Sequence, residues 1–115
     1  MNFNLQNLAL PLGLILFFCY RAWKLRNSKK QIPALLAEGA TLVDVRSPVE
    51  FENSHHPQCI NIPLNGFEGE THRIPKDRPV ILCCASGTRS GIAARILKSQ
   101  GYSRVLNVGP WTQLL

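Results

Sequence analysis

The sequence predicts a small α/β domain with a parallel sheet, preceded by a separate N-terminal segment. Apolar runs of strand length alternate with helical patterns over about 85 residues, which is typical of βαβ units. These runs are continuously apolar, as expected for strands of a parallel sheet that is covered on both faces. The first 30 residues differ, because an uninterrupted apolar run there is followed by a cluster of cations.

The N-terminal segment is predicted to be a transmembrane anchor over residues 1–23. The apolar run Leu8–Tyr20 spans only about 20 Å as a helix, whereas Phe3–Trp23 spans about 31 Å, close to a bilayer core of roughly 30 Å. Tyr20 and Trp23 occupy the place of an interfacial aromatic belt. A cleaved signal peptide and a core helix are the alternatives. The signal peptide is disfavoured because no basic residue precedes the apolar run.

The distribution of charge predicts how the anchor is oriented. The net charge is +6, but residues 31–115 carry eight basic and seven acidic groups and are nearly neutral. Nucleic-acid binding is therefore not expected. Residues 21–30 hold five basic groups and no acid: Arg21, Lys24, Arg26, Lys29 and Lys30. By the positive-inside rule the N-terminus lies outside and the domain lies in the cytoplasm. Residues 24–31 are predicted to be a basic linker.

The domain itself is predicted to occupy residues 32–115. Pro33 is placed to begin a short helix that Gly39 ends. Ser47 is expected to cap the next helix. Gly101 lies where a later helix should end. Strands are expected at 41–45, 59–62, 79–83 and 105–108, helices at 48–52, 67–73 and 90–99, and a final turn at 111–115.

The segment Cys84–Ser90 is the most informative part of the chain. It lies between an apolar strand and a helical pattern, which places the sulfur of Cys84 at a helix N-terminus, where backbone N–H groups favour an anion. With Arg89 closing the loop, the thiol is expected to have a lowered pKa and to be a thiolate nucleophile at neutral pH. The alternative is a core cysteine. The other cysteines, Cys19, Cys59 and Cys83, form no CxxC pair, so neither disulfides nor zinc are predicted.

Two separated segments resemble the rhodanese family. Asp44–Phe51, followed by His55 and Ile60–Leu64, is similar to the family's upstream signature. Cys84–Ser90 is similar to its active-site loop. The resemblance extends over residues 31–109. It implies a small rhodanese-like, doubly wound α/β domain, with this loop at the carboxyl end of a central strand.

The resemblance also implies a sulfurtransferase that needs no metal or organic cofactor. The catalytic Cys84 would take sulfane sulfur from a donor such as thiosulfate and pass it, as a persulfide, to a thiol or cyanide acceptor. The persulfide would be bound by the loop residues Ala85, Ser86, Gly87, Thr88, Arg89 and Ser90, with Arg89 adding positive charge. Structural roles near the site are expected for Asp44, Arg46 and His55. The adjacent His55 and His56 lack further metal ligands at a suitable spacing.

Three alternatives to this function remain open in the sequence. A phosphatase would use Cys83, because Cys83 and Arg89 have Cys-x5-Arg spacing. Gly87 favours Cys84 instead, since it follows Cys84 by three residues. A second alternative is a rhodanese-like binding module without activity. A third is a sulfur relay to an acceptor protein at the membrane.

Overall fold

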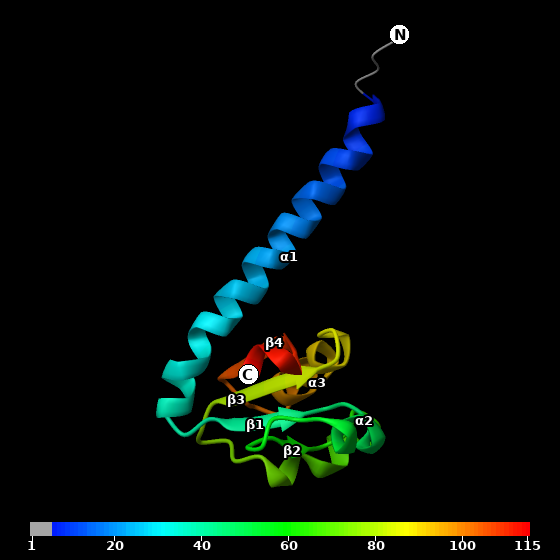
Figure 1. The fold of residues 1–115 in the computed structure, drawn as a ribbon. Coiled ribbons are helices and arrows are strands. Elements are labelled where there is room, and N and C mark those ends of the chain that lie inside the picture. Colours follow the sequence, from blue (N-terminus) through cyan, green and yellow to red (C-terminus); the bar gives the residue numbers. More distant parts are fainter. Residues whose placement is uncertain (1–5) are drawn as a thin grey trace.

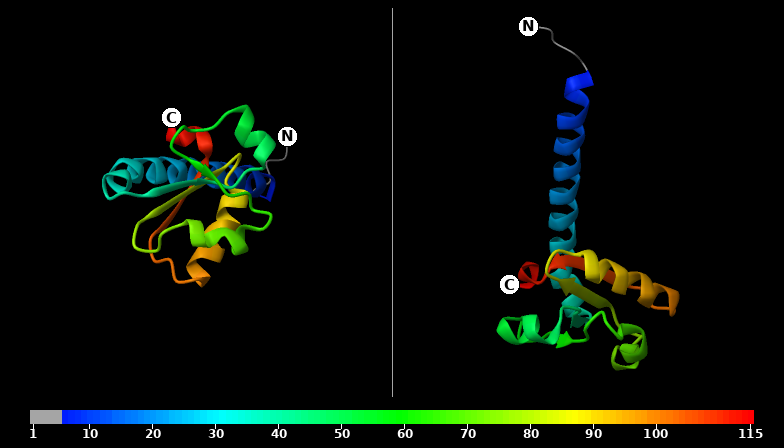
Figure 2. Two further views of the ribbon diagram at one scale, coloured as in Figure 1. Left: turned by 90° about the horizontal axis from the view of Figure 1, so that it is seen from below. Right: turned by 90° about the vertical axis from the view of Figure 1, so that its right-hand side faces the viewer.

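The computed structural model describes residues 6–115 and shows a small α/β domain at one end of a long helix (Figure 1). This helix, α1, runs from Gln6 to Ala37, and its N-terminal end projects away from the domain in both orientations that show it lengthwise (Figures 1 and 2). The long dimension of the molecule, 62 Å, reflects this helix.

The domain is built on a four-stranded parallel sheet in the order β2-β1-β3-β4. The α/β fold with a parallel sheet, predicted from the sequence, is therefore confirmed. The strands are β1 (Thr41–Asp44), β2 (Ile60–Asn61), β3 (Val80–Cys84) and β4 (Val105–Pro110). They are connected by the helices α2 (Pro48–Asn53) and α3 (Thr88–Ser99) and by the 3₁₀-helix η1 (Phe67–Arg73), and η2 (Trp111–Leu114) follows β4.

Both faces of the sheet are covered by apolar side chains. Alternate residues of β3 point to opposite faces, as they must in a strand. Val80, Leu82 and Cys84 pack with residues of η1 and α3. Ile81 and Cys83 pack on the other face with the base of α1 and with β4. Strand β3 is therefore buried along its whole length, and the cysteine loop follows its carboxyl end.

Helix α1 extends further than the sequence predicted. Residues 24–31, for which a linker was predicted, are helical, and Pro33 lies inside the helix instead of beginning it. Lys, Arg, Leu and Gln favour helices here. Tertiary packing adds to this preference, because Ser28 and Ile32 are both buried against the domain.

The predicted transmembrane anchor over residues 1–23 is not supported. Within residues 6–115, no helix is both long and apolar enough to cross a membrane. The apolar part of α1 ends at Tyr20, and Arg21, Lys24 and Arg26 follow in the same helix, which lowers its mean hydropathy. Residues 1–5 of the predicted anchor lie outside the described part of the chain.

Candidate active site

The sulfur of Cys84 lies at the N-terminus of α3, as the sequence predicted. The N–H of Gly87 donates a hydrogen bond to Sγ at 2.8 Å, and the Ser90 hydroxyl lies 3.3 Å from Sγ. Gly87 is the N-cap residue of α3 and has a positive φ of 104°. As a glycine it has no side chain that could accept hydrogen bonds from the free N–H groups at the start of the helix. The sulfur also accepts from the N–H of Ser90, the third residue of α3, to which an N-cap side chain usually bonds.

The pKa of the Cys84 thiol is lowered from its ordinary value, although burial alone would raise it. The side chain is completely buried, which disfavours a charge. Hydrogen bonds from the Ser90 hydroxyl and from the N–H groups of Ser90, Gly87 and Ser86 outweigh this cost. These hydrogen bonds favour the ionised form of the sulfur, which lies beneath the exposed loop residues Ala85, Ser86 and Thr88.

Asn107 on β4 forms hydrogen bonds with the residues that contact the sulfur. Its Nδ2 donates to the Gly87 carbonyl at 3.1 Å, and its Oδ1 accepts from the N–H of Gly109 at 2.9 Å. Ser90 Oγ lies 2.6 Å from the same Oδ1. A register shift between β3 and β4 occurs at this point, and such bulges commonly redirect side chains beside active sites.

Arg89 lies in the loop but is paired with a carboxylate. Its guanidinium donates two hydrogen bonds to Glu50, at 2.6 and 3.0 Å. Glu50 also completes a capping box with Ser47, the predicted cap of α2. The resemblance implied that Arg89 adds positive charge at the loop, and in the structure this charge lies in an ion pair with Glu50. The pair also ties the cysteine loop to α2.

The three residues expected to have structural roles all form hydrogen bonds. Asp44 and Arg46 make a buried ion pair with an N–O distance of 2.8 Å, and Arg46 also donates to the Ser54 carbonyl. These contacts fix the segment that leads from β1 into α2. His55 stacks on Phe51 at a ring distance of 3.7 Å and bonds the Phe51 carbonyl. It therefore lies at the end of α2 and stabilises that helix.

Cys83 is placed on the opposite face of the sheet from Cys84. It is fully buried in the apolar core between the sheet and the base of α1, beside Cys59. The contact with Cys59 is the main reason that the pKa of Cys83 is raised, followed by burial and by the charge of Asp44. A neutral thiol on this face is unsuited to the nucleophilic role that the phosphatase alternative requires.

Two hollows flank the cysteine loop. One, of about 270 Å³, lies between α1 and the loop residues Ser86, Gly87 and Thr88. The other, of about 510 Å³, lies beside Arg89 and is bordered by the segment that follows β2, including Pro63 and Leu64. Within residues 6–115 no three His, Cys, Asp or Glu side chains are grouped to bind a metal ion.

Two residues at the site were missed from the sequence, and each left a signal. Glu50 follows Ser47 by three residues, which is the capping-box spacing. Asn107 is a lone polar residue in the apolar run of β4, and an amide that is partly buried in a strand requires partners. Neither signal could reveal the partner, because Glu50 and Arg89 are 39 positions apart and Asn107 and Ser90 are 17 apart.

Several known proteins are similar to this chain in sequence and in fold. The thiosulfate sulfurtransferase GlpE of Pseudomonas syringae pv. syringae is 35% identical over 83 residues, which cover 72% of this chain and 78% of that protein. A sulfurtransferase of Allochromatium vinosum is 41% identical over 71 residues, covering 62% of this chain and 66% of the relative. The structure of the human single-domain sulfurtransferase TSTD1 is similar with a TM-score of 0.61 at 27% identity, covering 74% of this chain and 89% of that one.

Some relatives are longer than this chain. A putative sulfur carrier protein of Bacillus subtilis, YrkF, is 37% identical over 79 residues, which cover 65% of this chain and 43% of its own length. The chain thus spans about two fifths of the length of YrkF and about two thirds of the length of the A. vinosum sulfurtransferase. Residues 28–109, well over half of the chain, match the family described as the rhodanese-like domain. The protein therefore belongs to the rhodanese-like family.

Proposed function

We propose that the protein is a sulfurtransferase that carries sulfane sulfur as a persulfide on Cys84. The observation that supports this most is the lowered pKa of a thiol that accepts hydrogen bonds from Gly87 and Ser90 at the start of α3. A thiolate held by N–H donors is the form in which cysteine attacks sulfur. The names of the relatives, sulfurtransferase and thiosulfate sulfurtransferase, agree with this chemistry.

The proposed reaction has two balanced steps. The Cys84 thiolate attacks the sulfane sulfur of a donor such as thiosulfate, forming a new S–S bond. The bond between that sulfur and the sulfonate breaks, and sulfite leaves with the electron pair. An acceptor, cyanide or a thiolate, then attacks the outer sulfur of the persulfide, and Cys84 leaves as a thiolate again.

Access to the sulfur is part of the proposal. Because Cys84 is fully buried, the exposed loop residues Ala85, Ser86 and Thr88 must move before a donor can reach it. The burial favours transfer over hydrolysis, since it keeps water from the persulfide. The N–H groups that stabilise the thiolate would also stabilise the persulfide.

The test is to treat the full chain with thiosulfate and measure a mass increase of one sulfur atom on the peptide that contains Cys84. Cyanide should then remove the sulfur and yield thiocyanate. The variant Cys84→Ser should lose both reactions, and the matched control Cys83→Ser should keep them. If thiosulfate leaves Cys84 unmodified, a binding module without activity becomes the better description. Phosphate-ester hydrolysis that depends on Cys83 would instead support a phosphatase.

The location of the protein is a second proposal, based on the sequence. The Leu and Phe side chains of α1 between Leu10 and Phe18 are more than half exposed. An apolar surface of this kind is typical of a site that binds a membrane or another protein. We propose that a membrane covers it, with the domain on the cytoplasmic side and within reach of an acceptor protein. After cell fractionation the full chain should remain in the membrane pellet, and Leu14→Lys combined with Leu16→Lys should release it. Recovery of the unaltered chain in the soluble fraction would contradict this location.

A further inference from the structure

The hollow between α1 and the cysteine loop combines two chemically different walls. The domain contributes the loop residues Ser86, Gly87 and Thr88 together with Asn107 and Gly109, a wall of small and polar residues. Helix α1 contributes a wall that is apolar at one end and cationic in the middle. Its members are Phe17, Tyr20, Arg21, Lys24, Leu25 and Ser28.

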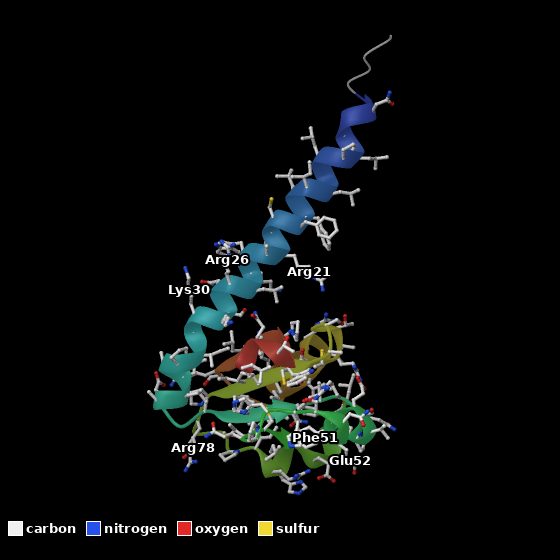
Figure 3. All side chains as sticks on the ribbon, in the orientation of Figure 1. Arg21, Arg26, Lys30, Phe51, Glu52 and Arg78 are labelled. Atoms are coloured by element: carbon white, nitrogen blue, oxygen red, sulfur yellow. The ribbon has the colours of Figure 1, made fainter. Side chains whose placement is uncertain are left out.

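These α1 residues form one face of the helix. They are separated by three, one, three, one and three positions, the spacing that places side chains on a single side. Figure 3 shows Arg21 on the side of α1 that faces the domain, whereas Arg26 and Lys30 point to the opposite side. Only two of the five cations in residues 21–30, Arg21 and Lys24, line the hollow.

Contacts toward the C-terminal end of α1 hold this helix against the domain. Gln113 of η2 donates to the Leu25 carbonyl at 2.8 Å. Leu25 packs closely against Gly109, where an added Cβ would lie only 3.1 Å from its Cδ2. One and two turns further on, Ser28 and Ile32 are buried. Arg21 and Lys24 are therefore presented to the loop from a docked part of the helix.

The charge at this hollow is unbalanced. No carboxylate lines it, and within residues 6–115 neither Arg21 nor Lys24 takes part in an ion pair. The single cation of the loop, Arg89, is already paired with Glu50. A ligand with negative charge would thus find two free cations within one turn of α1, on the wall opposite Ser86 and Thr88.

The size of the hollow indicates which ligand it suits. Its volume of about 270 Å³ equals roughly nine water molecules at about 30 Å³ each, which is more than a bare thiosulfate needs. The apolar parts of the Tyr20 and Leu25 side chains suit a carbon skeleton. Both features favour an organic thiol with carboxylate groups over a small inorganic donor.

We propose that Arg21 and Lys24 bind the carboxylates of such a thiol acceptor, so that α1 supplies an acceptor subsite to the cysteine loop. This inference rests on the proposed function. In the step concerned, the acceptor thiolate attacks the outer sulfur of the Cys84 persulfide, the new S–S bond forms on the acceptor, and Cys84 leaves as a thiolate. The cations hold the acceptor and take no part in bond breaking.

The test compares two acceptors with the full chain, using thiosulfate as donor. Mercaptosuccinate carries two carboxylates, and 2-mercaptoethanol carries none. The double variant Arg21→Gln/Lys24→Gln should raise KM for mercaptosuccinate by roughly five- to tenfold, the loss expected for two partly exposed charge contacts. Its kcat, its KM for 2-mercaptoethanol and its KM for thiosulfate should stay unchanged. The matched control Arg26→Gln/Lys30→Gln removes the same charge from the other side of α1 and should leave all values unchanged.

Ionic strength provides a second measurement. Added salt should raise KM for mercaptosuccinate in the unaltered chain and have little effect in the Arg21/Lys24 double variant, because screening acts only on charges that are present. An unchanged KM for mercaptosuccinate in this variant would overturn the subsite, as would an equal change in the control variant. A change confined to thiosulfate would also overturn it in favour of a donor site. Failure of the proposed function is distinguished separately, since it appears as absence of persulfide on Cys84 in every variant.

Discussion

Cys84 combines burial with a lowered pKa because its environment supplies hydrogen bonds in place of water. The Ser90 hydroxyl is the most sensitive member of this set, since it has one proton and three acceptors within reach. These acceptors are the Asn107 side chain, the Gly87 carbonyl and the sulfur, at 2.6, 3.2 and 3.3 Å from Oγ. A negative sulfur attracts the proton more strongly than a neutral one. The Ser90 hydroxyl therefore stabilises the thiolate form, although its proton can also be donated to Asn107 or to the Gly87 carbonyl.

Replacement of Ser90 by Ala should raise the pKa of Cys84, because its largest stabilising hydrogen bond is lost. Alkylation of Cys84 by iodoacetamide, followed across pH by peptide mass spectrometry, should show a titration midpoint at higher pH. The rate at neutral pH should fall by roughly tenfold, the effect of one hydrogen bond to a charged group. The midpoint is the decisive quantity, since it does not depend on how often the loop opens. Ser99→Ala, on the exposed end of α3, serves as the control, and an equal midpoint in Ser90→Ala would contradict the assignment.

At the scale of elements, the short helix α2 positions the cysteine loop. Its six residues are too few to be stable alone. The capping box of Ser47 and Glu50 begins it, and the pairing of Glu50 with Arg89 joins it to the start of α3. Since the same carboxylate makes both sets of contacts, the start of α2 and the cysteine loop are expected to be stable or unstable together.

This shared carboxylate predicts a specific dependence of stability on pH. Hydrogen bonds from Arg89 and Ser47 lower the pKa of Glu50 from 4.5 to about 2. A lowered folded-state pKa contributes stability above the unfolded value, and that contribution is lost as the pH falls toward the folded value. Glu50→Gln should therefore reduce the free energy of unfolding at neutral pH, and the deficit should shrink between about pH 5 and about pH 2. Urea unfolding at several pH values measures this.

The matched control for Glu50 is Glu52→Gln, an exposed carboxylate on the same helix. It should change stability little at any pH, since surface substitutions away from specific contacts are usually neutral. A deficit of Glu50→Gln that is constant with pH would show that the pairing with Arg89 does not stabilise the fold.

At the scale of the whole molecule, α1, β4 and the cysteine loop meet around two glycines. An added Cβ on Gly87 would lie 3.2 Å from the Cα of Gly109, and one on Gly109 would lie 3.1 Å from Leu25 of α1. Both glycines also have positive φ, at 104° and 76°. The loop, the last strand and the long helix are thus packed without room for side chains, so a displacement of one affects the others.

Gly109→Ala should for this reason destabilise the whole domain. The new methyl group would strain the backbone and press on Leu25, and either effect costs about 1–3 kcal/mol. The free energy of unfolding in urea measures the change. Gly69→Ala provides the control, because nothing lies within 4 Å of its added Cβ and its φ is not positive. Its effect should stay within roughly 0.5 kcal/mol, and an equally small effect of Gly109→Ala would show that α1 is not firmly docked at this point.

Features that depend on neighbouring residues could be predicted from the amino-acid sequence alone. Apolar runs such as Val80–Cys83 have the length and composition of buried strands, and Ser47 caps α2 because its side chain meets N–H groups of the next turn. Cys84 lies at the start of α3 for the same kind of reason, since a strand, a loop of small residues and a helical pattern follow one another directly.

Contacts between residues that are distant in the sequence depend on how the strands are arranged in the sheet. Glu50 reaches Arg89 and Asn107 reaches Ser90 because the parallel strands bring their carboxyl ends to one edge of the sheet, in an order and register that no local pattern specifies. The extent of α1 was likewise decided by burial of Ser28 and Ile32 against the domain. A segment with the composition of a linker is therefore a helix, and the face of that helix with Arg21 and Lys24 lines the hollow beside the cysteine loop.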